Sequence, residues 1–417
     1  APTGVAAINA GGVTIHSFFK MPFRPLLPDD PDLSLQENRI FNFLKYRKEH
    51  RKLIEAAELI IIDEISMVRA DVIDFIDRVL RVYSGNMREP FGGKQLLLVG
   101  DVYQLEPVVK ADEKEILRRF YASPFFFSAR VFKEMNLVSI ELQKVYRQTD
   151  EAFVRVLDNI RINSLKRNDL DLLNTRCNPT FKPSDDDFYV TLATKRDVVD
   201  YINDEKLRKL DGKAIIFKGE ITGEFNESSL PTLKELELKE NAQIIFIKND
   251  PDRRWFNGTI GRISCLSEEG EIIVQLENGE EYELNRDIWR NIRYRYDEKE
   301  NKITEEELGS FVQYPIRLAW AITVHKSQGL TFDKVIVDFS GGVFAGGQAY
   351  VALSRCTSLQ GMVLKKPLVT SDIFIRDEIV HFARSFNNQQ IIDKSLKQAQ
   401  ADVFYTEAVQ HFDKGQF

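Results

Sequence analysis

The chain has 417 residues, 43% of them hydrophobic, and so holds enough apolar material for two to four domains. No stretch approaches the roughly 20 apolar residues of a membrane helix, and no signal peptide opens the chain, so we expect an intracellular protein without a membrane anchor. Three scattered cysteines and five dispersed histidines argue against a disulfide framework and a His/Cys metal centre. The net charge of −7 disfavours nucleic-acid binding over the whole surface but leaves room for a local basic channel.

The N-terminal residues combine hydroxyl, imidazole and aromatic side chains after a Gly-Gly pair. Thr14, His16 and Phe18 form a mixture suited to contacts with a single nucleic-acid strand. Phe18 is a candidate for stacking on a base, although a single Phe more often belongs to a core. Residues 17–51 are rich in proline and aromatic side chains and too irregular for a sheet. They form either a surface element that contacts a ligand or a packed loop.

Residues 59–62 are an unbroken apolar run that ends on Asp63 and Glu64. This pattern predicts a strand buried on both faces, and ligands of α/β proteins collect beyond the carboxyl ends of such strands. With a nucleoside triphosphate bound there, both carboxylates would face the Mg²⁺ ion, Asp63 as its holder and Glu64 as the group that polarises the attacking water. The alternative is a strand that merely ends in an acidic turn.

A second apolar strand, from Gln95 to Gly100, also ends on a carboxylate, Asp101. Gln104 follows in the next loop, and its amide can hold both a γ-phosphate oxygen and a water. Two neighbouring strands that each end on a carboxylate favour a nucleotide site. Between them we predict a helix capped by Ser66, with a core-facing side made by Val72, Phe75, Ile76, Val79 and Tyr83.

Two arginines follow apolar elements in different parts of the chain. A short strand, Leu137–Ile140, is predicted ahead of Arg147, and a helix from Tyr350 presents Arg355. A planar guanidinium neutralises charge on a γ-phosphate better than lysine does, so we expect the two to converge on one nucleotide. Taken alone, an arginine after a strand is usually a surface residue.

The second half of the chain has the pattern of another α/β unit with an insertion. A helix near Phe153 and a strand at Phe188–Leu192 open the unit, which resumes near Gln313 through the strand Lys334–Asp338. Residues 213–310 read instead as short strands with Asn-Gly turns, which predict hairpins and a small inserted β-barrel. The last 45 residues have a helical pattern.

A polar cluster follows the apolar residues 319–322. It contains Thr323, His325, Lys326, Ser327 and Gln328, whose hydroxyls, imidazole and amide suit phosphate and sugar contacts with a single strand. The alternative is the polar start of a helix.

Six segments in this order resemble the helicase motifs of the petite-integration-frequency (PIF) family, in the RecD-like branch of superfamily one (superfamily 1B). They are Ala-Pro-Thr-Gly-Val-Ala-Ala-Ile-Asn-Ala-Gly-Gly-Val-Thr-Ile-His (1–16), Ile-Asp-Glu-Ile-Ser-Met (62–67), Gly-Asp-Val-Tyr-Gln-Leu-Glu-Pro-Val (100–108), Val-Tyr-Arg-Gln (145–148), Thr-Val-His-Lys-Ser-Gln-Gly (323–329) and Tyr-Val-Ala-Leu-Ser-Arg (350–355). The resemblance spans about residues 1–360 and leaves the C-terminal residues and much of 17–51 without a motif.

The resemblance implies an α/β fold with two RecA-like parallel-sheet domains of the P-loop NTPase type. Residues 1–148 would form the first domain, with a duplex-splitting wedge at about 17–51. Residues 149–212 and 311–370 would form the second, with the small barrel at 213–310 and a helical extension at 371–417.

The same resemblance implies an ATP- and Mg²⁺-dependent motor that walks 5′ to 3′ on single-stranded DNA and unwinds duplexes and forks. Such an enzyme serves replication, repair, recombination and telomere maintenance. It would work as a monomer, or as a dimer on DNA, in the bacterial cytoplasm rather than a eukaryotic nucleus or mitochondrion.

Roles carried over by resemblance fall on two sets of residues. At the nucleotide, Asp63 and Glu64 would serve Mg²⁺ and water, Gln104 would report the γ-phosphate, Arg147 and Arg355 would stabilise charge, and Gln328 and Gly329 would border the nucleotide. The DNA channel would be lined by Thr14, His16, Phe18, Thr323, His325, Lys326 and Ser327.

The chain departs from the family pattern at its start. The Gly-Lys-Ser/Thr loop that cradles the β- and γ-phosphates should precede Ala1, and neither Gly92-Gly93-Lys94 nor Gly341-Gly342 replaces it. We therefore expect a fragment of the motor that, by itself, binds ATP poorly and hydrolyses little of it. One alternative is a non-catalytic DNA-binding or scaffolding module with helicase architecture. Another, a nuclease-linked motor subunit, would need a nuclease partner.

Overall fold

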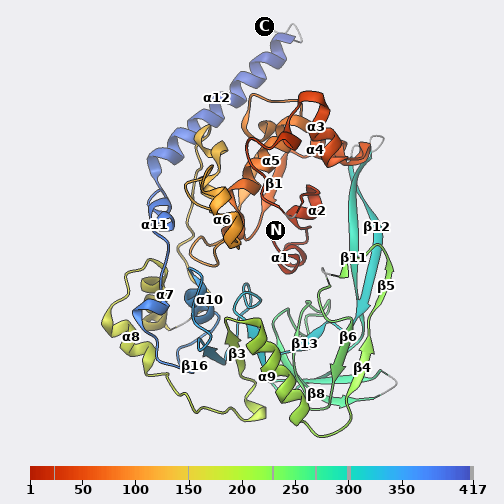
Figure 1. Cartoon of the computed structure of the whole chain (residues 1–417), viewed down its shortest axis with the longest axis vertical. Coiled ribbons are helices and arrows are strands. Elements are labelled where there is room, and N and C mark those ends of the chain that lie inside the picture. Colours follow the sequence, from red (N-terminus) through yellow and green to blue (C-terminus); the bar gives the residue numbers. More distant parts are fainter. Residues whose placement is uncertain (23, 149, 228–229, 268–269, 298–301, 414–417) are drawn as a thin grey trace.

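The computed structural model describes residues 1–22, 24–148, 150–227, 230–267, 270–297 and 302–413, and Figure 1 shows them as two lobes. The upper lobe holds the first third of the chain, and the lower lobe holds most of the remainder. Each lobe contains a parallel sheet flanked by helices, which is the mixed α/β architecture of two RecA-like domains.

The upper sheet pairs β1 (Leu59–Ile62) in parallel with β2 (Gln95–Leu98). Helices α4 (Lys48–Ala56) and α5 (Ala70–Tyr83) belong to the same hydrophobic core. The expectation that β1 is buried on both faces is wrong, since Leu59 and Ile61 are 46% and 57% exposed. In the described part of the chain this sheet has two strands, and the core covers only one of its faces.

Helix α5 carries the predicted apolar side but not the predicted cap. All five residues of that side, Val72, Phe75, Ile76, Val79 and Tyr83, are buried. The helix begins at Ala70, with Arg69 at the cap position, whereas Ser66 lies in the preceding 3-10 turn η3 (Ile65–Met67). Glu64, which precedes this turn, adopts a left-handed conformation.

The predicted strand at Leu137–Ile140 is absent, and this stretch is irregular. The backbone of Ser139 and Glu141 bonds instead to Asn387 of the C-terminal segment, at 2.9 and 3.0 Å. Alternating apolar residues are thereby left exposed, up to 88% at Leu142. Apolar alternation predicts a strand only where a neighbouring sheet edge accepts it, and no described strand pairs with this segment.

The segment 17–51 is a packed helical element over α5. Met21, Leu26, Ile40 and Tyr46 are all buried in the upper core. The segment contains η1 (Pro31–Leu33), η2 (Gln36–Asn38) and α3 (Arg39–Leu44). Helix α1 (Gly4–Asn9) precedes it, and α2 (Ile15–Phe18) overlaps its start. The upper lobe is completed by η4 (Pro90–Gly93), α6 (Ala111–Leu117), η5 (Phe126–Ser128) and η6 (Arg130–Lys133).

The lower lobe is built on a four-stranded parallel sheet in the order β14-β3-β15-β16. Its strands are β14 (Ala321–Thr323), β3 (Val190–Ala193), β15 (Val335–Asp338) and β16 (Met362–Leu364). Around it lie α7 (Glu151–Arg161), α8 (Arg167–Asn174), η7 (Asp185–Asp187), α9 (Arg196–Lys209), α10 (Gln348–Ser354) and η9 (Thr370–Asp372). The predicted helix near Phe153 and the strands at 188–192 and 334–338 are confirmed, each within two residues at its ends.

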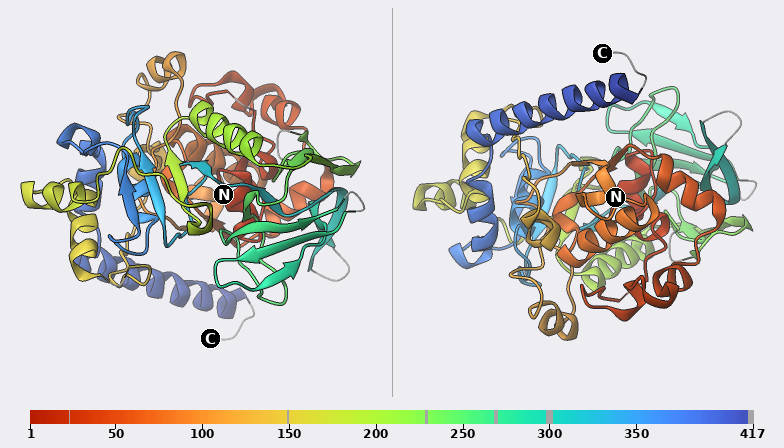
Figure 2. Two further views of the ribbon diagram at one scale, coloured as in Figure 1. Left: turned by 90° about the horizontal axis from the view of Figure 1, so that it is seen from below. Right: turned by 90° about the horizontal axis from the view of Figure 1, so that it is seen from above.

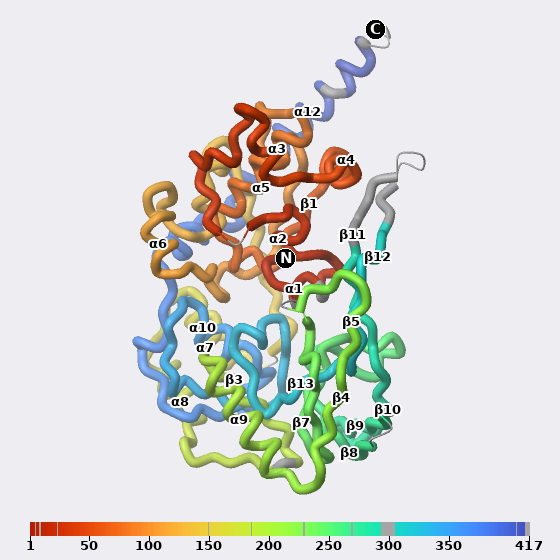
Figure 3. The backbone as a smooth tube through the Cα atoms, turned by 45° about the vertical axis from the view of Figure 1, so that its right-hand side comes forward, coloured from red at the N-terminus to blue at the C-terminus, as the bar shows by residue number. Residues whose placement is uncertain are grey.

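The described residues between 215 and 318 form three antiparallel sheets beside this lobe. The five-stranded sheet has the order β10-β9-β8-β7-β13, with β10 (Glu281–Glu283), β9 (Ile272–Leu276), β8 (Ile260–Leu266), β7 (Gln243–Phe246) and β13 (Ile316–Leu318). The others join β4 (Ile215–Lys218) to β6 (Glu235–Leu238), and β11 (Asp287–Asp297) to β12 (Lys302–Gln313) and β5 (Glu220–Gly223). Both predicted Asn-Gly turns link antiparallel strands, with positive φ angles of 100° at Gly258 and 84° at Gly279. Figure 3 shows the β11–β12 ribbon rising beside α4 of the upper lobe.

The C-terminal residues are helical, as predicted. Helix α11 (Asp377–Ala383) packs near Tyr103 and Phe125 of the upper lobe, and α12 (Gln389–Asp413) runs along the outside of the molecule (Figure 2). The three cysteines are free thiols, as their spacing suggested. Among the described residues, no helix is both long and apolar enough to span a bilayer.

Candidate nucleotide and DNA site

Two carboxylates stand at the end of β1. The Oδ1 atom of Asp63 accepts a 2.8 Å hydrogen bond from the backbone N–H of Glu64, which holds Glu64 at a φ of 53°. Burial, and next the charge of Asp63, raise the pKa of Glu64, while Arg355 acts in the opposite direction. Gly100, two residues after β2, leaves space for this turn because it has no side chain. A Cβ there would lie 3.0 Å from the backbone nitrogen of Ile65.

A hydrogen-bonded bridge joins the lobes at this point. The Nε2 atom of Gln328, from the lower lobe, donates to Glu64 Oε2 at 2.7 Å and to Gln104 Oε1 at 3.3 Å. Gln104 donates in turn to Asp101 Oδ2 at 3.2 Å. We call Glu64, Gln328 and Gln104 the interlobe amide bridge. The bridge connects Glu64, which follows β1, and Gln104, which follows β2, to Gln328 of the lower lobe.

Arg355 lies on the lower-lobe side of the same region. Its side chain is 1% exposed and donates to the carbonyls of Val351 and Leu330 and to the hydroxyl of Ser354. Burial, and then repulsion from Arg147, lower the pKa of Arg355 to about 10, while Glu64 acts in the opposite direction. Two cations held near each other in a buried position are poised to pair with an anion.

Arg147 is held against the same helix end. Its Nη1 atom donates to the carbonyl of Ser354 at 3.3 Å, and burial lowers its pKa. The neighbouring Gln148, a residue whose role the sequence did not reveal, donates to the carbonyls of Ser354 and Cys356 at 2.9 and 3.0 Å. Arg147 and Gln148 therefore tie the segment after the upper lobe to the C-terminal end of α10.

The structure brings Asp63, Glu64, Gln104, Gln328, Arg147 and Arg355 into one region between the lobes. Gly329 is separated from them. It lines a different cavity of about 430 Å³, together with Phe332 of the lower lobe and Asn257 from the loop between β7 and β8. Its φ of 79° turns the chain away just after Gln328, so the sequence neighbour of a bridging residue faces elsewhere.

Two candidate DNA residues, His16 and His325, lie in adjoining cavities. His16 lines a cavity of about 350 Å³ with Met67 and Lys110, and His325 lines one of about 380 Å³ at the lobe junction. Both cavities include Val108, which is 68% exposed. Burial lowers the pKa of both imidazoles, with a contribution from Arg69 at His16, so both are neutral at physiological pH and suited to hydrogen bonding.

Three hydroxyl groups expected in the DNA channel serve local turns. Thr14 caps α2 by accepting from the N–H of Ser17, and Thr323 accepts from the N–H of Lys326. Ser327 has no exposed surface and donates to the carbonyl of Val324 at 2.8 Å. For Ser327 a channel-lining position is therefore wrong, because the hydroxyl satisfies the backbone of its own turn. Lys326, in contrast, is exposed.

Phe18 is apart from His16. Its ring packs edge-on against Phe19 at 4.9 Å between centroids and lies 5.6 Å from the ring of His50. It lines a small cavity of about 170 Å³ that also includes Asn291 of the β11–β12 ribbon. Residues two apart on a short helix point in different directions, which the sequence spacing did not reveal.

Another contact between the lobes has no recognisable sequence signal. Arg376, ahead of α11, donates through two nitrogens to both carboxylate oxygens of Glu106, at 2.9 and 3.1 Å. The bidentate geometry fixes the loop after Gln104 to the lower lobe. Arg376 stands outside every motif, so only the folded chain reveals this pair.

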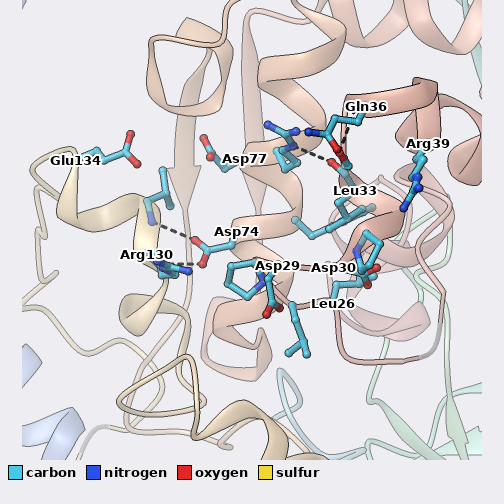
Figure 4. Close-up of a pocket in the computed structure, with 17 residues that line it drawn as sticks. Leu26, Asp29, Asp30, Leu33, Gln36, Arg39, Asp74, Asp77, Arg130 and Glu134 are labelled. Carbon is cyan, nitrogen blue, oxygen red and sulfur yellow. Dashed lines mark hydrogen bonds between the residues drawn. The ribbon is translucent and has the colours of Figure 1, made fainter.

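The largest cavity described, of about 560 Å³, lies in the upper lobe and contains none of the candidate residues (Figure 4). Asp74, on its wall, accepts from the backbone N–H groups of Arg130 and Val131 at 3.0 and 3.1 Å. Asp77 accepts from Arg81 and from the N–H of Phe91. Asp74 and Asp77 therefore hold neighbouring elements in place, and their role at this cavity is structural.

Comparisons with known proteins identify the family of this chain. A family model described as PIF1-like helicase matches residues 1–168, and a second, described as helicase, matches residues 288–405. The chain is 33% identical over 368 residues to the ATP-dependent DNA helicase Pif1 of Campylobacter jejuni, covering 85% of this chain and 79% of that protein. It is 32% identical over 375 residues to human ATP-dependent DNA helicase PIF1, of which it spans only 53%.

Solved structures give the same result. Bacteroides Pif1 in complex with ADP-AlF4 has a TM-score of 0.83 and 41% identity, over 92% of this chain and 86% of that chain. The unliganded Bacteroides structure also scores 0.83, and the form bound to single-stranded DNA scores 0.64 over the same share of this chain.

Proposed function

Because this chain belongs to the PIF1-like helicase family, we propose that it is an ATP-driven motor that moves 5′ to 3′ on single-stranded DNA and unwinds forked duplexes inside the cell. The observation that carries this proposal is the interlobe amide bridge beside the buried Arg355 and the half-buried Arg147. A triphosphate held there would contact groups from both lobes, so that its hydrolysis would change how the lobes fit together.

The upper lobe would supply the metal and base chemistry. Asp63 and Glu64 offer carboxylate oxygens, the ligands that Mg²⁺ prefers, and Mg²⁺ commonly binds one or two carboxylates together with phosphates. The ion would neutralise charge between the phosphates. Glu64 would accept the proton of the attacking water, a role that suits a carboxylate of raised pKa.

Two arginines, one from the segment after the upper lobe and one from the lower lobe, would supply the charge stabilisation. Arg355 and Arg147 would meet the γ-phosphate, where guanidinium groups spread over the equatorial oxygens. Gln104 and Gln328 would release their mutual contact and rebond to phosphate or water. Loss of the phosphate would restore the hydrogen bond from Gln328 to Glu64. The contact between the lobes would thus depend on whether the γ-phosphate is present.

DNA would run along the adjoining cavities of His16 and His325, with Lys326 on a phosphate. The test compares unwinding of duplexes that carry either a 5′ or a 3′ single-stranded tail, with a chain that includes a Gly-Lys-Ser/Thr loop ahead of Ala1. We expect ATP-dependent unwinding of the 5′-tailed duplex alone. Unwinding of the 3′-tailed duplex alone would refute the polarity, and DNA binding without any unwinding would favour a scaffolding module.

A further inference from the structure

A glycine-rich loop, residues 339–347, connects β15 to α10 and carries an exposed aromatic ring. Phe344 is 58% exposed, and it lines the cavity of about 380 Å³ that also contains His325 and Val108. No motif covers Phe344. The ring belongs to none of the hydrophobic clusters of the described residues, so packing does not explain its position.

Both ends of this loop are fixed by close approaches. Near its start, a Cβ on Gly341 would lie 3.1 Å from the hydroxyl of Thr194. At its end, Gly347 has a φ of 75°, and a Cβ there would lie 2.1 Å from the carbonyl oxygen of Gln104. The loop therefore runs from the carboxyl edge of the lower sheet to the backbone of the interlobe amide bridge.

The ring itself is held at a defined position. The backbone N–H of Phe344 donates to Oε1 of Gln348, which is fully buried at the start of α10. Only the side chain of Phe344 projects, while its backbone is tied to the helix that ends at Arg355. A fixed backbone with an exposed ring loses little conformational entropy when a flat partner covers the ring.

The surroundings of the ring are suited to a nucleotide. Phe125 and Tyr121 contribute apolar walls, and Lys114 and Arg118 place cations around the same cavity. Arg376 also lines it but is paired with Glu106, and Glu378 adds a carboxylate. Nucleobases stack on aromatic rings whatever their sequence, and the phosphates beside them favour cations. Since Val108 also lines the cavity of His16, the two cavities adjoin along one line across both lobes.

We propose that Phe344 is a stacking platform for one base of the bound single strand, carried on a loop whose far end contacts Gln104. The inference rests on the proposed DNA-translocating function and adds a base contact to it. Because only two residues lie between Phe344 and Gly347, a shift of the Gln104 loop on nucleotide exchange would move the ring with it. The ring would then grip or release a base once in each cycle.

The test measures the affinity of the 1–417 chain for a fluorescein-labelled oligothymidine by anisotropy, which requires no ATP hydrolysis. Phe344→Ala should weaken binding between about 5-fold and 100-fold. Phe344→Leu should also weaken it, whereas Phe344→Tyr should retain it because the flat ring remains. Phe256→Ala is the matched control, since Phe256 is 56% exposed and lines the separate cavity of Gly329.

A second probe separates stacking from other contacts. On an oligonucleotide of the same length that lacks bases, Phe344→Ala should bind as the unchanged chain does. Equal weakening on this probe, or unaltered binding of oligothymidine by Phe344→Ala, would overturn the inference while leaving DNA binding in place. Failure of the unchanged chain to bind either strand would instead remove the proposed function itself.

Discussion

Replacing Glu64 by glutamine removes one negative charge from the interlobe amide bridge and leaves its shape. Glu64 accepts from Gln328 at 2.7 Å, and the amide oxygen of a glutamine accepts the same hydrogen bond. The lost attraction to Arg355 is offset by relief of repulsion from Asp63 and Asp101. We therefore expect the stability to change by less than about 1 kcal/mol.

The effect on turnover should be far larger. A glutamine cannot accept the proton of the attacking water, and general-base catalysis contributes roughly 10²- to 10⁴-fold. The activation barrier should rise by about 3 to 5 kcal/mol, with nucleotide affinity nearly unchanged. The assay is DNA-stimulated ATP hydrolysis by a chain that carries a phosphate-binding loop ahead of Ala1, with nucleotide binding measured in parallel. Glu55→Gln, an exposed position on α4, is the matched control.

A pH profile adds an independent check. The pKa of Glu64 is raised, and only the ionised form accepts a proton, so activity should fall as the pH drops through this raised value. The acid limb of kcat/KM should consequently lie at a higher pH than an ordinary glutamate would give. Normal turnover by Glu64→Gln, or an acid limb at the usual glutamate range, would refute the assignment of Glu64 as the base.

Three further substitutions probe neighbouring parts of the site. Arg355→Ala should lower DNA-stimulated turnover by about 10³-fold or more, while the DNA affinity stays within about twofold, and a parallel loss of both would contradict a γ-phosphate role. Gly347→Ala should lower the melting temperature more than Gly342→Ala, because both have positive φ angles but only Gly347 lies against Gln104; equal shifts would exclude that contact as the cause. Lys326→Gln should reduce the salt slope of DNA binding by about 1, with Lys397→Gln on α12 as an unaffected control, and an unchanged slope would remove Lys326 from the phosphate path.

The sequence predicted the elements that depend on local periodicity. The buried side of α5, the strands predicted at 188–192 and 334–338 and both Asn-Gly turns follow from spacing alone, because their neighbours do not alter the outcome. The other two strands of the lower sheet, β14 and β16, were not predicted. The stretch at Leu137–Ile140 has the same kind of signal and forms no strand. Whether an apolar alternating segment becomes a strand depends on a partner edge, which is a tertiary property.

The candidate site shows the same division. Residue types and order placed Glu64, Gln104 and Arg355 together, since carboxyl ends of parallel strands meet at one edge. Side-chain direction was not predictable, as Ser327 turns inward to its own backbone while the adjacent Gln328 reaches across to Glu64. The Glu106–Arg376 pair joins positions 270 residues apart and leaves no mark in the sequence.

The contacts between the lobes differ in what they can transmit. The Glu106–Arg376 pair makes two charge-assisted hydrogen bonds and lies outside the interlobe amide bridge, so it acts as an attachment. The bridge of Gln328 to Glu64 and Gln104 is different, because in the proposed mechanism a γ-phosphate would compete for each of its partners. The bridge would therefore break and form again as the nucleotide is bound and hydrolysed. The Glu106–Arg376 pair would stay in place and serve as the pivot between the lobes. Because Gly347 lies against the backbone of Gln104, the proposed exchange would reach the lower lobe through the 339–347 loop and through Gln328 at once.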